Sequence, residues 1–222
     1  MKSVFAMAAT LCVLEGCTLA SAQSCAEFKR EMFALQRPSA AAIEVTNCRR
    51  ARNEYVVSVR LISDAGSTEA QQISAEGEAL VLFVDTSLDI NNDGVPDLGI
   101  ATGKGRSGDG MHYWLLGKNL LSLIDVGEAP MLKRSLVGRR PLWALVPGSG
   151  EVQATRIEYD LSLGALLQTK AIQFIPQLDS SYRVSVWVRS GTGSGGWLVE
   201  KPTLFLSEAD ARECMEGGKC PE

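Results

Sequence analysis

Apolar and polar residues alternate along most of this chain after residue 40. Between Tyr55 and Ile62, for example, one face of an extended chain would carry only large apolar side chains. Comparable short runs, bounded by turn residues, continue as far as Leu206. About ten such runs, with few helical periods between them, predict an all-β fold. The pattern leaves two architectures open, a β-sandwich and a small β-propeller-like domain.

Helical spacing is found near the two ends of the chain. Ser24 and Glu27 have the separation of a capping box, and apolar residues then recur on one helical face until Pro38. Near the other end, Ser207 is suited to cap a helix that stops at Gly217. We therefore expect a short helix at each end of the β domain.

The first 22 residues have the organisation of an export signal. A mostly apolar run follows Lys2 and ends in the small-x-small pattern of residues 20–22. Glu15 interrupts this run, which therefore falls short of the roughly 20 apolar residues that cross a bilayer. Cleavage after the run leaves residues 23–222 as a single predicted domain. In a second interpretation, a degenerate lipoprotein box ends at Cys17, and this cysteine carries a lipid anchor.

Export would place the remaining cysteines in an oxidising compartment. They are Cys25, Cys48, Cys214 and Cys220. An even number of cysteines in an exported chain predicts two disulfides. Three pairings are open, and proximity in sequence favours Cys25 with Cys48 and Cys214 with Cys220. A zinc site is the alternative, but it lacks the usual Cys-x-x-Cys spacing.

The charge pattern does not indicate a nucleic-acid partner. The formal net charge is −4 at pH 7, and acidic residues gather after Ser207. Basic residues occur only in small groups, and none of these groups forms the stripe that nucleic-acid binding requires. We expect no nucleic-acid partner and no transmembrane segment.

One polar loop carries the clearest chemistry in the sequence. An apolar run at residues 79–84 predicts a strand that leads into the loop, and another strand is predicted at residues 98–102. The candidate ligands between them are the side chains of Asp89, Asn91, Asp93 and Asp97 and the carbonyl of Val95. Gly94 stands where a calcium loop turns, but Ile100 replaces the bidentate glutamate of an EF-hand. The loop therefore predicts a structural Ca²⁺ between strands, and the alternative is an Asx-rich turn that binds no metal.

A glycine-rich segment at residues 103–110 is typical of a hairpin tip. This segment and residues 191–196 both match a dinucleotide-binding string, but strand-like residues follow where that motif needs a helix. His112 is the one histidine in the sequence, and no Gly-x-Ser-x-Gly motif accompanies it. We therefore expect a binding protein and not an enzyme.

Residues 89–98 match the string Asp-x-Asn-x-Asp-Gly-x-x-Asp-Leu and resemble the calcium loop of integrin-like FG-GAP/VCBS-type repeats. The longer stretch 79–116 is similar to the periplasmic immunity proteins of xanthomonads. It shares with them an apolar strand, the calcium loop, a glycine-rich tip and a following Tyr-Trp-Leu. That resemblance implies an inhibitor of lysozyme-like effectors delivered by type IV secretion, related to bacterial inhibitors of invertebrate-type lysozyme.

The same resemblance implies which residues meet the target. In those inhibitors a protruding loop with a Ser-Gly-x-x-Tyr motif enters the glycan cleft of the lysozyme. Here Ser107 and Gly108 are followed by Tyr113, two positions later than in the motif. The expected partner-binding residues are Ser107, Gly108, Asp109, His112 and Tyr113. Asp109 or His112 is expected to hydrogen-bond the catalytic acid of the hydrolase.

These observations favour a periplasmic, calcium-stabilised immunity protein that binds and blocks a lysozyme-like peptidoglycan hydrolase. A calcium-dependent adhesion or scaffold module of the cell envelope is the alternative from a different class. A small glycan hydrolase is a further alternative. Its candidate catalytic groups would be His112 and carboxylates that have no other assigned role.

Overall fold

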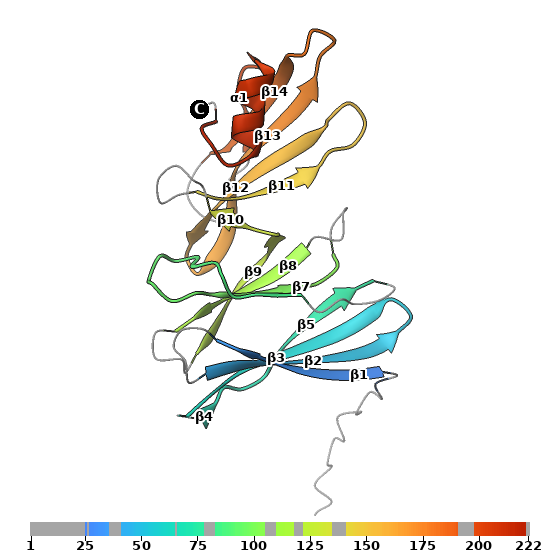
Figure 1. Ribbon diagram of the computed structural model, residues 1–222, viewed down its shortest axis with the longest axis vertical. Helices are drawn as coiled ribbons and strands as arrows, with labels where there is room; N and C mark the ends of the chain where they lie inside the picture. Colours follow the sequence, from blue (N-terminus) through green and yellow to red (C-terminus); the bar gives the residue numbers. More distant parts are fainter. Residues whose placement is uncertain are drawn as a thin grey trace, which may run out of the picture.

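The computed structural model describes residues 25, 27–35, 41–64, 66–77, 83–104, 110–117, 122–134, 141–190 and 198–220. Most of these residues lie in three antiparallel sheets, which are stacked along the long axis of the molecule (Figure 1). The all-β prediction is confirmed. Within these ranges, no helix is long and apolar enough to cross a membrane.

The first sheet contains five strands. They are β1 (Glu27–Ala34), β2 (Ala41–Ala51), β3 (Glu54–Ser63), β4 (Gly66–Ser67) and β5 (Gln71–Glu76). Their order is β1-β2-β3-β4, and β5 also pairs with β3. Alternate residues of β3, from Tyr55 to Leu61, are buried. The sheet therefore has one covered and one open face, as the period of two predicted.

The middle sheet has four strands in the order β6-β7-β8-β9. They are β6 (Val84–Asp85), β7 (Leu98–Ala101), β8 (Gly110–Leu116) and β9 (Leu123–Pro130). Every residue of β8 after Gly110 is buried, so this strand is covered on both faces. Of the strand predicted at residues 79–84, residues 79–82 lie outside the described part of the chain, Phe83 is not in a strand, and Val84 begins β6.

The third sheet has seven strands, and the chain ends in a helix against it. The strands are β10 (Lys133–Arg134), β11 (Leu142–Pro147), β12 (Ala154–Ser162), β13 (Ala165–Pro176), β14 (Tyr182–Arg189), β15 (Leu198–Glu200) and β16 (Leu204–Leu206). The helix α1 spans Glu208–Met215. Consecutive strands from β10 to β15 pair as neighbours, and β16 also pairs with β14.

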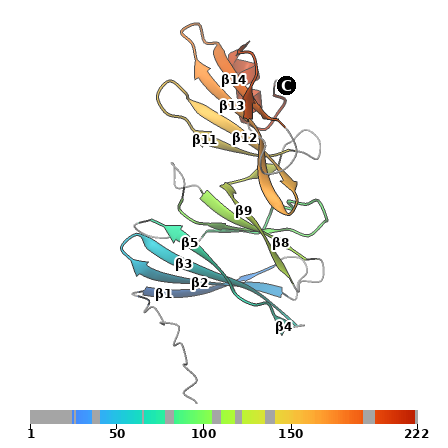
Figure 2. The ribbon, with the colours of Figure 1, turned by 180° about the vertical axis from the view of Figure 1, so that it is seen from behind.

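Figure 2 shows the same stacked layers from behind. Two hydrophobic cores lie between neighbouring layers, and a third lies under the C-terminal helix. Trp114 and Leu116 of β8 pack into a core with the first sheet. Tyr113 and Leu115 belong to a second core, which includes residues of the third sheet. The third core joins the third sheet to α1. Stacked layers of this kind correspond to the sandwich alternative, and the propeller-like alternative is not confirmed.

The prediction of an N-terminal helix is wrong. Residues 27–34 form β1, which pairs with β2 along its whole length. The Cys25–Cys48 disulfide fastens the start of this strand to β2. At its other end, Leu35 is buried in the first core with Phe33 packed against it. The hydrogen bonds between β1 and β2 and the burial of Leu35 outweigh the weak local preference of this segment for a helix.

The prediction at the C-terminus is confirmed. Ser207 caps α1, and its Oγ accepts a hydrogen bond from the Asp210 amide at 3.2 Å. The disulfide between Cys214 and Cys220, favoured by proximity, is also present. The guanidinium group of Arg156 lies buried beneath this segment and donates to the Cys214 carbonyl at 2.5 Å. The alternation pattern gave no sign of this buried arginine.

Candidate functional site

The predicted calcium loop is closed by hydrogen bonds from its own backbone. Asp89 Oδ1 accepts from the Asp93 amide at 3.1 Å, and its Oδ2 accepts from the Gly94 amide at 2.9 Å. Asn91 Oδ1 also accepts from the Asp93 amide, at 3.0 Å. Asp93 Oδ1 accepts from the Val95 amide at 2.8 Å. Successive side chains therefore stabilise successive turns of the loop, as Asp and Asn do in Asx turns.

Two residues of this loop have left-handed backbone conformations. The φ angle is 58° at Asn92 and 89° at Gly94. There is room for a side chain at Gly94, since an added Cβ would meet no atom within 4 Å. Glycine is favoured at this position because of the left-handed backbone conformation. Arg134 of β10 donates to Asn92 Oδ1 at 2.7 Å. The loop is thereby tied to the first strand of the third sheet.

Asp97, the last candidate ligand, is buried at the end of the loop, with 1% of its surface exposed. Its Oδ2 accepts from the Ile90 amide at 2.6 Å, and its Oδ1 accepts from the Leu116 amide at 2.9 Å. Burial raises the pKa of Asp97 to about 6, and the charges of Asp89 and Asp93 act in the same direction. Asp97 therefore connects the loop to the end of β8.

The donor set fits Ca²⁺ in part. Carboxylate and amide oxygens are ligands that Ca²⁺ prefers, and a cation would offset the repulsion that Asp97 experiences from Asp89 and Asp93. However, among the described residues no group of three or more Asp, Glu, His or Cys side chains is arranged to hold a metal ion. The internal hydrogen bonds also agree with the Asx-turn alternative. Calcium binding by Asp89, Asn91, Asp93, Val95 and Asp97 stays a prediction.

The β7–β8 hairpin is held closed at the base of its glycine-rich tip. The Thr102 amide donates to the Gly110 carbonyl at 2.8 Å, and the Gly110 amide donates to the Lys104 carbonyl at 2.7 Å. A Cβ at Gly110 would collide with that Lys104 carbonyl. The Glu76 amide of β5 donates to the Thr102 carbonyl at 2.7 Å. Lys104 Nζ forms an ion pair with Glu128 Oε1 of β9, also at 2.7 Å.

Three predicted partner-binding residues, Ser107, Gly108 and Asp109, lie outside the described residues. His112 follows the tip on β8, and 8% of its surface is exposed. Its Nε2 lies 2.8 Å from Asp125 Oδ1, and its ring centroid lies 4.4 Å from that of Trp114. His112 Nδ1 is buried without a hydrogen bond from the described residues. The histidine is therefore packed below the tip, between the first and middle sheets.

Tyr113 points to the opposite face of β8 and is only 1% exposed. Its hydroxyl accepts from the Leu132 amide at 2.7 Å and donates to the Pro130 carbonyl at 3.4 Å. A Cβ at Gly99 would lie 2.7 Å from the Tyr113 ring, so the absence of a side chain at Gly99 makes room for this ring. Burial raises the pKa of Tyr113 above its ordinary value. A direct contact between Tyr113 and a partner would require this side chain to leave the second core.

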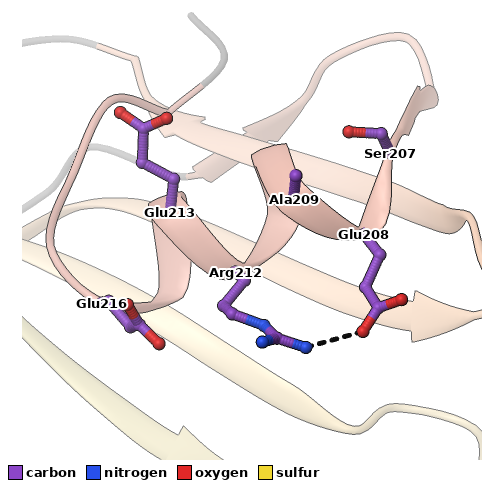
Figure 3. A pocket seen from close by; sticks show the side chains of 6 residues that line it. All are labelled: Ser207, Glu208, Ala209, Arg212, Glu213 and Glu216. Atoms are coloured by element: carbon purple, nitrogen blue, oxygen red, sulfur yellow. Dashed lines mark hydrogen bonds and ion pairs between the residues drawn. The ribbon is translucent and has the colours of Figure 1, made fainter.

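A hollow of about 700 Å³ lies beside α1, away from the loop and the tip (Figure 3). It is lined by Ser207, Glu208, Ala209, Arg212, Glu213 and Glu216. Arg212 turns toward Glu208 and forms an ion pair with it at 2.7 Å. The carboxylates of Glu213 and Glu216 give the rest of the hollow an acidic lining.

Comparison with known proteins finds distant structural similarity. No family model matches the chain, and no curated protein matches it. A solved structure described as "Structure of a Xanthomonas Type IV Secretion System related protein" aligns with a TM-score of 0.44 and 14% sequence identity. The alignment covers 79% of this chain and 99% of that one.

Proposed function

We propose that the chain is an exported protein that binds a lysozyme-like peptidoglycan hydrolase and blocks its glycan cleft. The observation that carries the proposal is the closed base of the β7–β8 tip. Hydrogen bonds join its two ends through Thr102, Lys104 and Gly110. Strands β5 and β9 brace it from either side through Glu76 and Glu128. A loop with fixed ends enters a groove at a lower entropic cost than a free chain.

The composition of the tip suits a sugar-binding groove. Residues 105–109 offer polar and charged side chains, and glycines allow close approach. The resemblance of residues 79–116 to immunity proteins supplies the class of target. We assign the first contacts to Ser107, Gly108 and Asp109. Because the side chains of His112 and Tyr113 are buried, we assign them to support of the tip.

The disulfides support an exported location. Cys25–Cys48 and Cys214–Cys220 are both formed, and disulfides persist mainly in oxidising compartments such as the periplasm. Residues 1–22 supply a matching export signal in the sequence. We therefore place the protein in the periplasm, with Cys17 as the site of a lipid anchor if the lipoprotein box is used.

A bound Ca²⁺ belongs to the proposal as a structural ion. Asp89, Asn91 and Asp93 would supply its side-chain oxygens, and the ion would compensate the negative charge of the loop. The loop directly precedes β7, which is paired with β8. A stabilised loop would therefore help to fix the hairpin that carries the tip.

The test is a titration of muramidase activity with the purified protein. The probes are c-type, g-type and invertebrate-type lysozymes, each assayed on peptidoglycan. The proposal predicts loss of activity near a one-to-one molar ratio for at least one of them. A scaffold module would leave all three enzymes active, and a hydrolase would clear peptidoglycan without any lysozyme. Either of these two results would overturn the proposal.

A further inference from the structure

Glu44 is a buried carboxylate on the outer face of the first sheet. Its neighbours in β2, Ile43 and Val45, face the first core, and side chains alternate along a strand. Glu44 therefore points to the other face, which no described element covers (Figures 1 and 2). It is nevertheless only 4% exposed. Other side chains on this face must cover it.

Two arginines from the neighbouring strands provide that cover. Arg30 of β1 forms an ion pair with Glu44 Oε2. Arg60 of β3, which stands opposite Glu44 in the register, places its Nε 2.6 Å from Oε1. The hydrogen bond from Arg60 is the largest influence that lowers the pKa of Glu44 below its usual value, and Arg30 acts in the same direction. The carboxylate is thus ionised at neutral pH.

One carboxylate does not satisfy two guanidinium groups. Each guanidinium has five N–H donors, whereas a carboxylate accepts about four hydrogen bonds. The trio of Arg30, Glu44 and Arg60 also keeps a net charge of +1. The side chains of Arg30 and Arg60 are 55% and 39% exposed, so their remaining donors are accessible from solvent.

These groups line a hollow of about 330 Å³ on the outer face. Its lining residues are Arg30, Glu44, Thr46, Ser58, Val59, Arg60 and Ala70. The Ser58 hydroxyl adds a donor beside the two guanidinium groups, while the Thr46 hydroxyl donates to the Ser58 carbonyl at 3.5 Å. The volume lies in the range of small-ligand sites. Paired guanidinium groups are the side chains best matched to carboxylates and phosphates.

We propose that this hollow binds an oxyanion, a carboxylate or phosphate group of a small ligand, through Arg30 and Arg60. Glu44 is the buried anchor that holds the two guanidinium groups in position before the ligand arrives. The site is separate from the β7–β8 tip and does not depend on the function proposed for it.

The test is an NMR titration of the full chain with inorganic phosphate and, separately, with succinate. Sodium chloride at matched ionic strength is the reference. We expect saturable shifts of the Thr46 and Ser58 amides with at least one oxyanion and none with chloride. The oxyanion that saturates at the lower concentration identifies the ligand chemistry. Arg60→Gln should weaken its binding about tenfold or more, because one charge-assisted contact is worth about 1.5–3 kcal/mol.

Arg183→Gln is the matched control. Arg183 is 41% exposed and forms an ion pair with Glu151 on the third sheet, so its replacement should leave the affinity unchanged. If Arg60→Gln fails to fold, Arg30→Gln replaces it, since Glu44 then keeps Arg60 as its partner. Shifts that chloride reproduces, or equal affinity in wild type and the foldable arginine variant, would overturn the proposal.

Discussion

The substitution Tyr113→Phe removes a single buried hydroxyl group from the middle sheet and keeps the aromatic ring. That hydroxyl accepts from the Leu132 amide at 2.7 Å and lies in a side chain that is 1% exposed. The ring would stay in the second core, but the buried Leu132 amide would lose its acceptor. An unsatisfied buried donor costs about 1–3 kcal/mol. For a domain of this size each kcal/mol lowers the melting temperature by about 2–4 °C.

Tyr182→Phe is the control, because it removes the same atom from a half-buried tyrosine whose hydroxyl hydrogen bond is exposed to solvent. The Tyr182 hydroxyl donates to Gln153 Oε1 at 2.7 Å, and surface changes of this kind stay within about 0.5 kcal/mol. Urea denaturation of both variants and wild type gives the two differences. Equal losses in the two variants, or a Tyr113→Phe protein as stable as wild type, would show that the buried hydroxyl does not stabilise the fold through the Leu132 amide. Under the proposed function, Tyr113→Phe should inhibit the target hydrolase as well as wild type does at temperatures below its melting temperature.

Three further predictions concern charge, capping and metal. Arg60 is the main cause that holds the pKa of Glu44 below its ordinary value of 4.5. The ionised Glu44 therefore stabilises the folded state fully above pH 4.5, and this contribution is lost as the pH falls through the lowered pKa. Glu44→Gln should remove this part of the acid dependence, and an unchanged stability-versus-pH curve would count against it. Ser207→Ala should cost about 1 kcal/mol by removing the α1 cap, and a loss confined within error would show that the cap contributes nothing. Ca²⁺ at about 100 times its Kd should stabilise wild type by about 2.7 kcal/mol, and it should not stabilise Asp93→Ala. Asp179→Ala, in an exposed turn, is the control and should respond to Ca²⁺ as wild type does. A wild-type melting temperature that saturating chelator leaves unchanged would show that no structural calcium is bound.

Much of the β architecture could be predicted because strand periodicity is a local property. In β3 the alternation from Tyr55 to Leu61 was visible in the sequence and corresponds to a buried face. The strands around the polar loop and the β7–β8 hairpin were also predicted. The layer order was not, because β8 is apolar on both faces. An apolar run shows that a strand is central but does not say which sheets cover it.

The N-terminal error has a different cause. Ser24 and Glu27 have the spacing of a capping box, yet the segment that follows is a strand. Its pairing with β2 and the Cys25–Cys48 disulfide connect residues far apart in sequence. Helical spacing in a short segment carries no information about such partners. Tertiary contacts therefore decided the structure of this segment.

The candidate sites show the same limit. The loop residues Asp89, Asn91 and Asp93 were found from their spacing, since their hydrogen bonds are local. That Asp97 connects the loop to β8 depends on a residue nineteen positions away, Leu116. The trio around Glu44 depends on three strands meeting in register. No local signal marks such groupings.

In the function proposed for this protein, the glycine-rich tip of the β7–β8 hairpin blocks a peptidoglycan hydrolase. The most direct measurement is the inhibition constant of the Ser107→Ala/Asp109→Ala double variant against the lysozyme that wild type inhibits. Thr192→Ala/Ser194→Ala, in the other glycine-rich segment, is the matched control. We expect inhibition weakened by about fivefold or more in the first variant, since each of the two lost polar contacts costs about 0.5–1.5 kcal/mol, and unchanged inhibition in the second. Equal inhibition by wild type and the tip variant would show that the tip does not block the hydrolase.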